Sequence, residues 1–231
     1  GADSAEALEE PFFLAHTEGA FVAEDHLAPH GVDAELHDRY LDYQGLVCSG
    51  GTTYLAKNNN ALLRYPSLRE HNREFTAVLM FREPLAHAAS LLAMHRRYTA
   101  MQDGDPFVRT YMDWLAHHEF GGGHKPFRFG RETAAGVPDT LDYWLDRWTE
   151  YYRHAMTVDG HRLVFLSHAT WSASPTAALK AILEVAEVEA TAPPLEPHTR
   201  QRQVEETADP KRLEAARAVY NQLVERALHL D

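Results

Sequence analysis

Residues 75–84 read FTAVLMFREP, and this stretch decides the fold of the chain. Its first seven residues form a continuous apolar run with β-favouring side chains, which is typical of a central parallel strand. Pro84 follows at a favourable first position for a helix. Apolar residues then recur at helical spacing: Leu85, Ala88, Ala89, Leu92 and Ala93. The sequence therefore predicts a strand over residues 75–81 that leads into a helix over residues 84–98.

Further strands and helices alternate along the chain on both sides of this stretch. Short apolar runs predict strands at residues 54–56 and 162–166. Helical periodicity, with proline and glycine as boundaries, predicts the remaining helices: residues 60–73 (interrupted at Pro66), 106–118, 141–152, 175–186 and 210–230. The glycine-rich residues 121–138 are expected to form a loop or lid. Alternating strands and helices favour an α/β fold with a central parallel sheet flanked by helices, in a single domain over residues 1–231.

Composition excludes several classes of function. The net charge of −12 over 231 residues argues against a nucleic-acid surface. The single cysteine, Cys48, excludes an internal disulfide and a cysteine-based zinc site, and we expect a reducing, cytoplasmic setting. No apolar run approaches the length of a transmembrane helix. The 15 histidines are scattered along the chain, and the sequence contains no HExxH pattern, so we expect no metal.

Three side chains that bind phosphate well occupy related positions. Lys57 follows the 54–56 run, Arg82 ends the 75–81 run, and Ser90 stands eight residues after Arg82. Ligands of open parallel sheets bind beyond the carboxyl ends of the strands, so this edge is the expected site. The arginine fork donates two parallel hydrogen bonds to a phosphate, and a serine hydroxyl can donate a third. The alternative is that Arg82 pairs with Glu83 or another carboxylate, while Ser90 is a small packing residue.

The order and spacing of these residues resemble the sulfotransferases that use 3′-phosphoadenosine 5′-phosphosulfate, in particular bacterial members. That family carries a lysine-containing strand, a helix, a strand ending in Arg-x-Pro, and a serine eight residues after the arginine. Residues 162–168 and 174–179 are similar to its later strand and its proline-led, alanine-rich helix. The resemblance covers roughly residues 50–230 and implies a P-loop NTPase-like fold.

The resemblance also implies an activity and its residues. The chain would transfer a sulfuryl group from 3′-phosphoadenosine 5′-phosphosulfate to a hydroxyl or amine of a small-molecule, lipid or glycan acceptor. The product would be 3′-phosphoadenosine 5′-phosphate, and no metal would be needed. Arg82 and Ser90 would hold the 3′-phosphate, Lys57 would face the phosphosulfate, and His168 would lie near the adenine.

Two features depart from the family. The family opens with a strand and a phosphosulfate loop of the type Lys/Arg-Ser-Gly-Thr-Thr, and residues 1–45 contain no match. Residues 49–53, SGGTT, have a similar composition, but they do not precede a long helix, so we expect a turn there. The loop is then either upstream of Gly1 or absent. Asn59 is the second departure, because some cytosolic members have a catalytic histidine two residues after the strand lysine.

The missing loop keeps two other functions open. A catalytically inactive, sulfotransferase-like binding module is one alternative. A P-loop kinase-like phosphotransferase is the other, but it requires a Walker-type Gly-Lys-Ser/Thr loop that the sequence does not contain.

An active transferase needs a base that removes the acceptor proton. Related enzymes often use a glutamate early in the chain, which makes Glu10 the first candidate and His16 the second. His118, Glu119 and His124 flank the glycine-rich segment and are alternatives that would also contact the acceptor.

Overall fold

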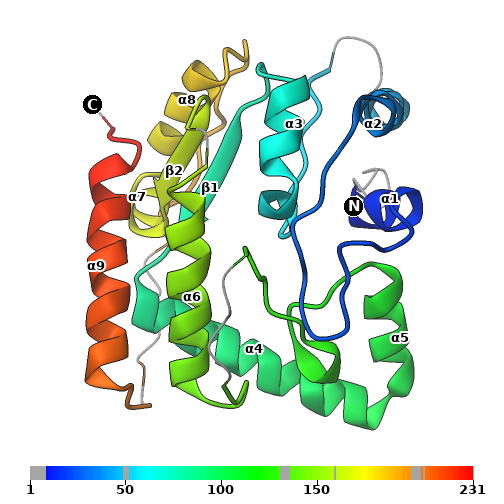
Figure 1. The fold of residues 1–231 in the computed structure, drawn as a ribbon. Coiled ribbons are helices and arrows are strands. Elements are labelled where there is room, and N and C mark those ends of the chain that lie inside the picture. Colours follow the sequence, from blue (N-terminus) through cyan, green and yellow to red (C-terminus); the bar gives the residue numbers. More distant parts are fainter. Residues whose placement is uncertain are drawn as a thin grey trace. The chain divides into compact units, whose positions relative to one another are not determined.

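A computed structural model of the chain describes residues 9–48, 52–130, 136–158, 160–198, 204 and 206–230 (Figure 1). The chain divides into two compact units. The first comprises Gly1–Asn72 and His95–Glu132, and the second comprises Arg73–Met94 and Thr133–Asp231. The single domain expected from the sequence stays a prediction.

The second unit contains the parallel sheet. Strand β1, Ala77–Phe81, pairs in parallel with β2, Leu163–Ser167, so that Phe81 lies opposite Ser167. The strands predicted near these positions are confirmed, and the chain is a mixed α/β protein. Among the described residues the sheet has two strands, and Val78 and Met80 of β1 are each 42% exposed. The larger sheet with a fully buried central strand is therefore not seen in the described part of the chain.

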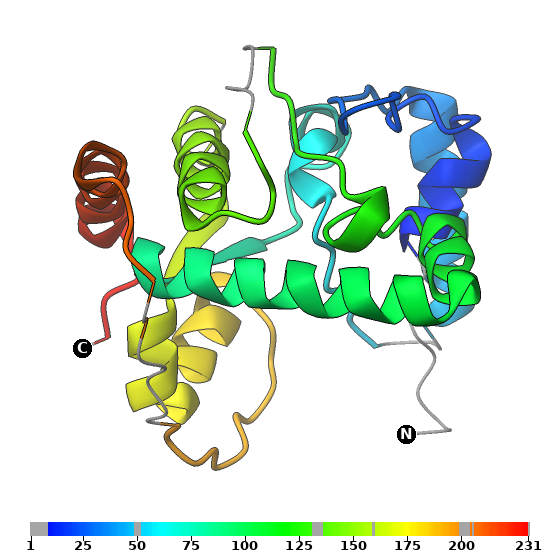
Figure 2. The ribbon, with the colours of Figure 1, turned by 90° about the horizontal axis from the view of Figure 1, so that it is seen from below.

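Helices of the second unit cover both sides of the strands. They are α6 (Leu141–Ala155), α7 (His168–Ala173), α8 (Pro175–Val185) and α9 (Pro210–Arg226). Figure 2 shows α6 and α9 on one side of the strands and α7 and α8 on the other. The inner face of α6 is buried and aromatic, as expected from its sequence, and includes Trp148 and Tyr152. The Tyr152 hydroxyl donates a hydrogen bond to the carbonyl oxygen of Met80 at 2.8 Å, which ties α6 to β1.

The first unit is built from helices and turns. Its α-helices are α1 (Glu9–His16), α2 (Ala34–Val47), α3 (Tyr65–His71) and α5 (Pro106–Trp114), with 3₁₀ turns η1 (Ala61–Leu63) and η2 (Gly121–Gly123). Helix α4, Pro84–Gly104, contributes its last residues to this unit and its first residues to the other. The core packs the aromatic side chains of Phe13, Phe21 and Tyr40 with aliphatic neighbours such as Leu27 and Leu63. Figure 1 shows α1 beside α2.

Three expectations about the first unit need correction. The strand predicted at residues 54–56 is wrong: the segment is irregular, and Leu55 is 89% exposed. A run of three apolar residues has too few side chains to define a buried strand. Pro66 does not interrupt a helix but lies in the first turn of α3, where its missing N–H is tolerated. The helix predicted to reach residue 118 ends at Trp114, because Ala116 adopts a left-handed backbone with φ of 52°.

The remaining expectations concern loops. Residues 49–51 of the predicted SGGTT turn lie outside the described residues. Among the described residues 121–130 and 136–138, the expected loop contains only the short turn η2 and an isolated bridge at Phe127. Within the described part of the chain, no helix has both the length and the hydropathy that a membrane span requires.

Candidate functional site

The carboxyl ends of the two strands place Arg82 and His168 in the second unit. Each residue directly follows one member of the opposed pair Phe81 and Ser167, so both leave the sheet at the same edge. Both side chains are half-buried. Ser90 lies in α4 of the same unit, about 9 Å along the helix axis from Pro84 at the usual helical rise.

Arg82 is not neutralised by a neighbouring carboxylate of the described residues. It makes no hydrogen bond or ion pair with them. Glu83, the partner proposed in the alternative interpretation, accepts a hydrogen bond from the backbone N–H of Ala86 at 2.7 Å. Glu83 therefore caps the beginning of α4 and does not pair with Arg82.

The charge of Arg82 lowers the pKa of two neighbouring histidines, His87 and His168. Burial lowers the pKa of His87 to about 4, and the charge of Arg82 adds to this effect. Burial, followed by the charge of Arg82, also lowers the pKa of His168. Both rings have hydrogen-bond partners, since Trp148 Nε1 donates to His87 Nδ1 at 3.1 Å and Ser172 Oγ lies 3.2 Å from His168 Nδ1. The two histidines are accordingly neutral at pH 7, and Arg82 supplies the positive charge at this edge.

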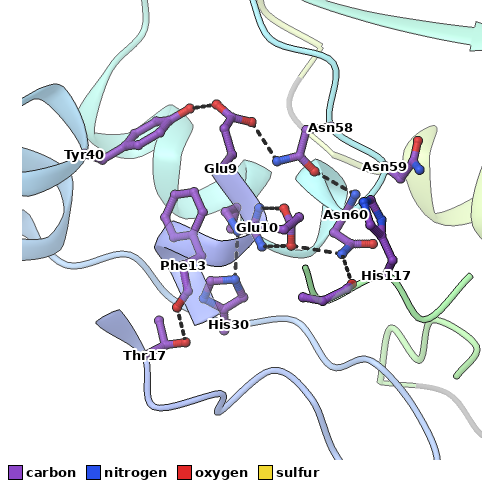
Figure 3. A network of polar contacts seen from close by, with 12 residues as sticks. Glu9, Glu10, Phe13, Thr17, His30, Tyr40, Asn58, Asn59, Asn60 and His117 are labelled. Atoms are coloured by element: carbon purple, nitrogen blue, oxygen red, sulfur yellow. Dashed lines mark hydrogen bonds and ion pairs between the residues drawn. The ribbon is translucent and has the colours of Figure 1, made fainter. Parts of the chain in front are cut away.

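The first unit holds a separate, buried network of polar side chains around α1 (Figure 3). Arg64 Nη1 and Nη2 donate to the two carboxylate oxygens of Glu10 at 2.5 Å and 2.9 Å. Asn60 Nδ2 also donates to Glu10 Oε2 at 2.9 Å. Burial opposes ionisation, but the hydrogen bonds and charge of Arg64 outweigh it and lower the pKa of Glu10. A carboxylate with occupied oxygens and a lowered pKa is a weak proton acceptor, which disfavours Glu10 as the base.

Glu9 lies next to Glu10 on α1 but faces other partners. It accepts hydrogen bonds from the hydroxyls of Tyr40 and Tyr54, the latter at 3.0 Å, and from Asn58 Nδ2 at 2.7 Å. Asn58 Oδ1 in turn accepts the backbone N–H of Asn60 at 2.8 Å. The two neighbouring glutamates therefore fix the conformation of residues 58–60, directly after Lys57.

A more accessible group of polar side chains lies at the end of this fixed segment. Asn59 Nδ2 donates to Glu119 Oε1 at 2.7 Å, and His117 Nδ1 lies 3.2 Å from the same oxygen. The His117 side chain is 43% exposed, and that of Glu119 is 16% exposed. The hydrogen bond to Glu119 raises the pKa of His117, while the charge of Lys57 acts in the opposite direction. The structure thus brings Lys57 and Glu119 into one region.

The other histidines predicted for the site have structural contacts. His118 is buried, and its Nδ1 lies 3.2 Å from the carbonyl oxygen of Gly123. His124 Nδ1 lies 3.1 Å from the carbonyl oxygen of His118, so both residues shape the glycine turn. His16 Nδ1 lies 2.8 Å from the Phe12 carbonyl oxygen of its own helix. Their roles in substrate binding or catalysis stay predictions.

His117 belongs to this polar group, but the sequence did not identify it as a candidate site residue. It stands beside His118, and no spacing rule distinguishes the two. No group of three or more potential metal ligands lies together among the described residues.

Comparisons with protein-family models, with curated proteins and with solved structures found no match.

Proposed function

We propose that this chain is a sulfotransferase that moves a sulfuryl group from 3′-phosphoadenosine 5′-phosphosulfate to an acceptor hydroxyl or amine. The observation that carries this proposal is the position of Arg82. It is a half-buried arginine at the carboxyl edge of a parallel β-α unit, and it has no carboxylate partner among the described residues. Ser90 stands eight residues further on, in the helix that begins at Pro84.

The charge of the whole chain makes this arginine more informative. A net charge of −12 repels a phosphate ester, so a nucleotide must be held by local cations. Arginine binds phosphate through two parallel, charge-assisted hydrogen bonds. Keeping a half-buried arginine unpaired has an energetic cost that a structural role would not explain, whereas an anionic ligand would offset it.

Lys57 of the first unit is the other cation that the resemblance assigns to the cofactor. It is exposed and pairs with no carboxylate among the described residues, and it precedes the segment that Glu9 and Glu10 hold in place. Its role toward the phosphosulfate stays an expectation that follows from the resemblance to the sulfotransferase family.

Calorimetric titration with 3′-phosphoadenosine 5′-phosphate tests the proposal. We expect saturable binding by the full chain, and roughly ten- to hundredfold weaker binding by Arg82→Ala, from the loss of hydrogen bonds to a charged group. Arg217→Ala, which changes an exposed arginine of α9, is the matched control and should bind like the unaltered chain. Absent binding, or equal binding by Arg82→Ala, would remove the basis for the assignment.

A further inference from the structure

We propose that His87 is an uncharged hydrogen-bond donor to the anion that Arg82 binds, and that Trp148 holds the ring in the form that can donate. This inference rests on the anion-binding role proposed above for Arg82. All three residues belong to the second unit, and they come from the end of β1, from α4 and from α6. The sequence did not identify His87 as a candidate site residue.

His87 lies in the first turn of the helix that follows Arg82. Strand β1 ends at Phe81 and α4 begins at Pro84, so only a short connection separates the arginine from this turn. The backbone N–H of His87 donates to the carbonyl oxygen of Glu83 at 2.9 Å. This hydrogen bond ties His87 to the residue directly after Arg82, and both side chains therefore belong to the same strand–helix junction.

The contact with Trp148 determines which ring nitrogen of His87 carries the proton. Trp148 Nε1 donates to His87 Nδ1 at 3.1 Å. An indole N–H can only donate, so Nδ1 accepts through its lone pair and the proton of the neutral ring lies on Nε2. The Trp148 side chain is 2% exposed, and its burial on α6 keeps the indole donor in place. Trp148 is accordingly a positioning residue for His87.

The same contact keeps the His87 ring uncharged. Protonation of Nδ1 would remove the lone pair that accepts from Trp148 and would place two N–H groups against each other. Burial, followed by the charges of Arg82 and His168, lowers the pKa of His87 to about 4, in agreement with this geometry. Near neutral pH His87 therefore offers an N–H donor without a charge, while Arg82 supplies the positive charge.

The Nε2–H group of His87 is left without a partner by the described residues. Their hydrogen bonds to this ring use Nδ1 alone. The side chain is half-buried, and Nε2 is not one of the polar atoms that the described residues enclose completely, so a ligand can reach it. A half-buried donor without a partner costs free energy that a ligand acceptor would recover. Arg82 and His87 both offer unpaired donors at one junction, which points to one anionic ligand.

A phosphate monoester has the acceptors that these donors require. Its three terminal oxygens are strong acceptors, and each can accept more than one hydrogen bond. The planar fork of Arg82 would bind two of these oxygens, and Nε2–H of His87 would donate to the third. The oxygens still have lone pairs for the hydrogen bond expected from Ser90. The ligand group recognised in this way is a phosphate monoester, which is the chemistry of the 3′-phosphate.

Two replacements of His87 separate anion binding from a purely structural contact with Trp148. The asparagine amide ends at the position of Nδ1, so His87→Asn can still accept from Trp148 but has no donor for the ligand. The longer glutamine amide reaches the position of Nε2, so His87→Gln retains that donor. Calorimetry of the full chain with 3′-phosphoadenosine 5′-phosphate should show roughly tenfold weaker binding for His87→Asn and a smaller loss for His87→Gln. His154→Asn, at a half-buried histidine of α6, is the matched control and should bind like the unaltered chain.

NMR of the histidine rings in the unaltered chain separates this inference from the proposed function. We expect the His87 proton on Nε2, and we expect its signal to shift when 3′-phosphoadenosine 5′-phosphate or inorganic phosphate is added. If the nucleotide does not bind but phosphate shifts the signal, the sulfotransferase assignment fails and the donor role stands. The donor role fails if the proton lies on Nδ1 or if neither anion shifts its signal. It also fails if His87→Asn binds the nucleotide within twofold of the unaltered chain, or more tightly than His87→Gln.

Discussion

Arg64 and Glu10 form a two-pronged ion pair in the interior of the first unit. The Arg64 side chain is 1% exposed and that of Glu10 is 9% exposed. The guanidinium carbon also lies 4.0 Å from the centre of the Phe13 ring, an arrangement that favours a cation. This pair connects α1 to α3 and to Asn60, and so links the start of the described chain to the segment after Lys57.

Removing one partner of this ion pair should strongly destabilise the protein. Arg64→Ala leaves the buried Glu10 charge without its partner, and such changes cost about 3–5 kcal/mol. The measurement is urea unfolding followed by circular dichroism. Arg39→Ala is the control: its pair with Glu35 is largely exposed and should contribute less than about 0.5 kcal/mol. A loss below about 1 kcal/mol for Arg64→Ala would contradict the structural role of the pair.

The ion pair also predicts an acid-sensitive step that involves His30. Arg64 Nε donates to His30 Nε2 at 2.8 Å, which requires a neutral ring. Burial, followed by the charge of Arg64, lowers the pKa of His30 to about 4. As pH falls below 6.5 the unfolded chain gains a proton that the folded chain does not, so stability declines between pH 6.5 and 4.

Replacing His30 should reduce this pH dependence. His30→Gln retains an oxygen that can accept from Arg64 but has no titrating group. Urea midpoints measured from pH 7.5 to 4 should therefore decline less steeply in the variant. Part of the decline should remain, because the pKa of His87 is also about 4. Identical pH profiles for the variant and the unaltered chain would show that His30 does not contribute.

Two leucines that differ in burial should differ in how much their replacement by alanine lowers the free energy of unfolding. Leu145 on α6 is 0% exposed, whereas Leu46 on α2 is 88% exposed. Leu145→Ala should lower the free energy of unfolding by about 2–5 kcal/mol through lost burial and a cavity. Leu46→Ala should change it by less than about 0.5 kcal/mol. Guanidinium unfolding of both variants measures the contrast, and similar losses at the two sites would contradict the described packing.

Local patterns predicted the second unit better than the first. The apolar run at residues 75–81 and Pro84 located β1 and the start of α4, because period and helix-start chemistry are local properties of the chain. The strand predicted from the short apolar run at residues 54–56 was wrong, because the conformation of this segment depends on partners that are distant in the sequence. Tyr54, for example, donates to Glu9, 45 residues earlier.

In the candidate site, too, local sequence patterns predicted some residues, whereas others depend on contacts between distant segments. Arg82 and His168 could be placed at a strand edge, because each follows an apolar run in the sequence. The group of His117, Glu119 and Asn59 joins segments about 60 residues apart, and only the folded chain brings them together. Glu10 was predicted as a base, but nothing in its local sequence reveals that Arg64 would occupy both of its oxygens.

The most direct test of the central claim compares two nucleotides that differ in the 3′-phosphate. Calorimetry with 3′-phosphoadenosine 5′-phosphate and with adenosine 5′-phosphate should be performed on the unaltered chain, Arg82→Ala and Arg217→Ala. We predict that the unaltered chain and Arg217→Ala prefer the nucleotide with the 3′-phosphate, and that Arg82→Ala loses this preference. An unchanged preference in Arg82→Ala, or no preference in the unaltered chain, would contradict the claim that Arg82 holds the 3′-phosphate.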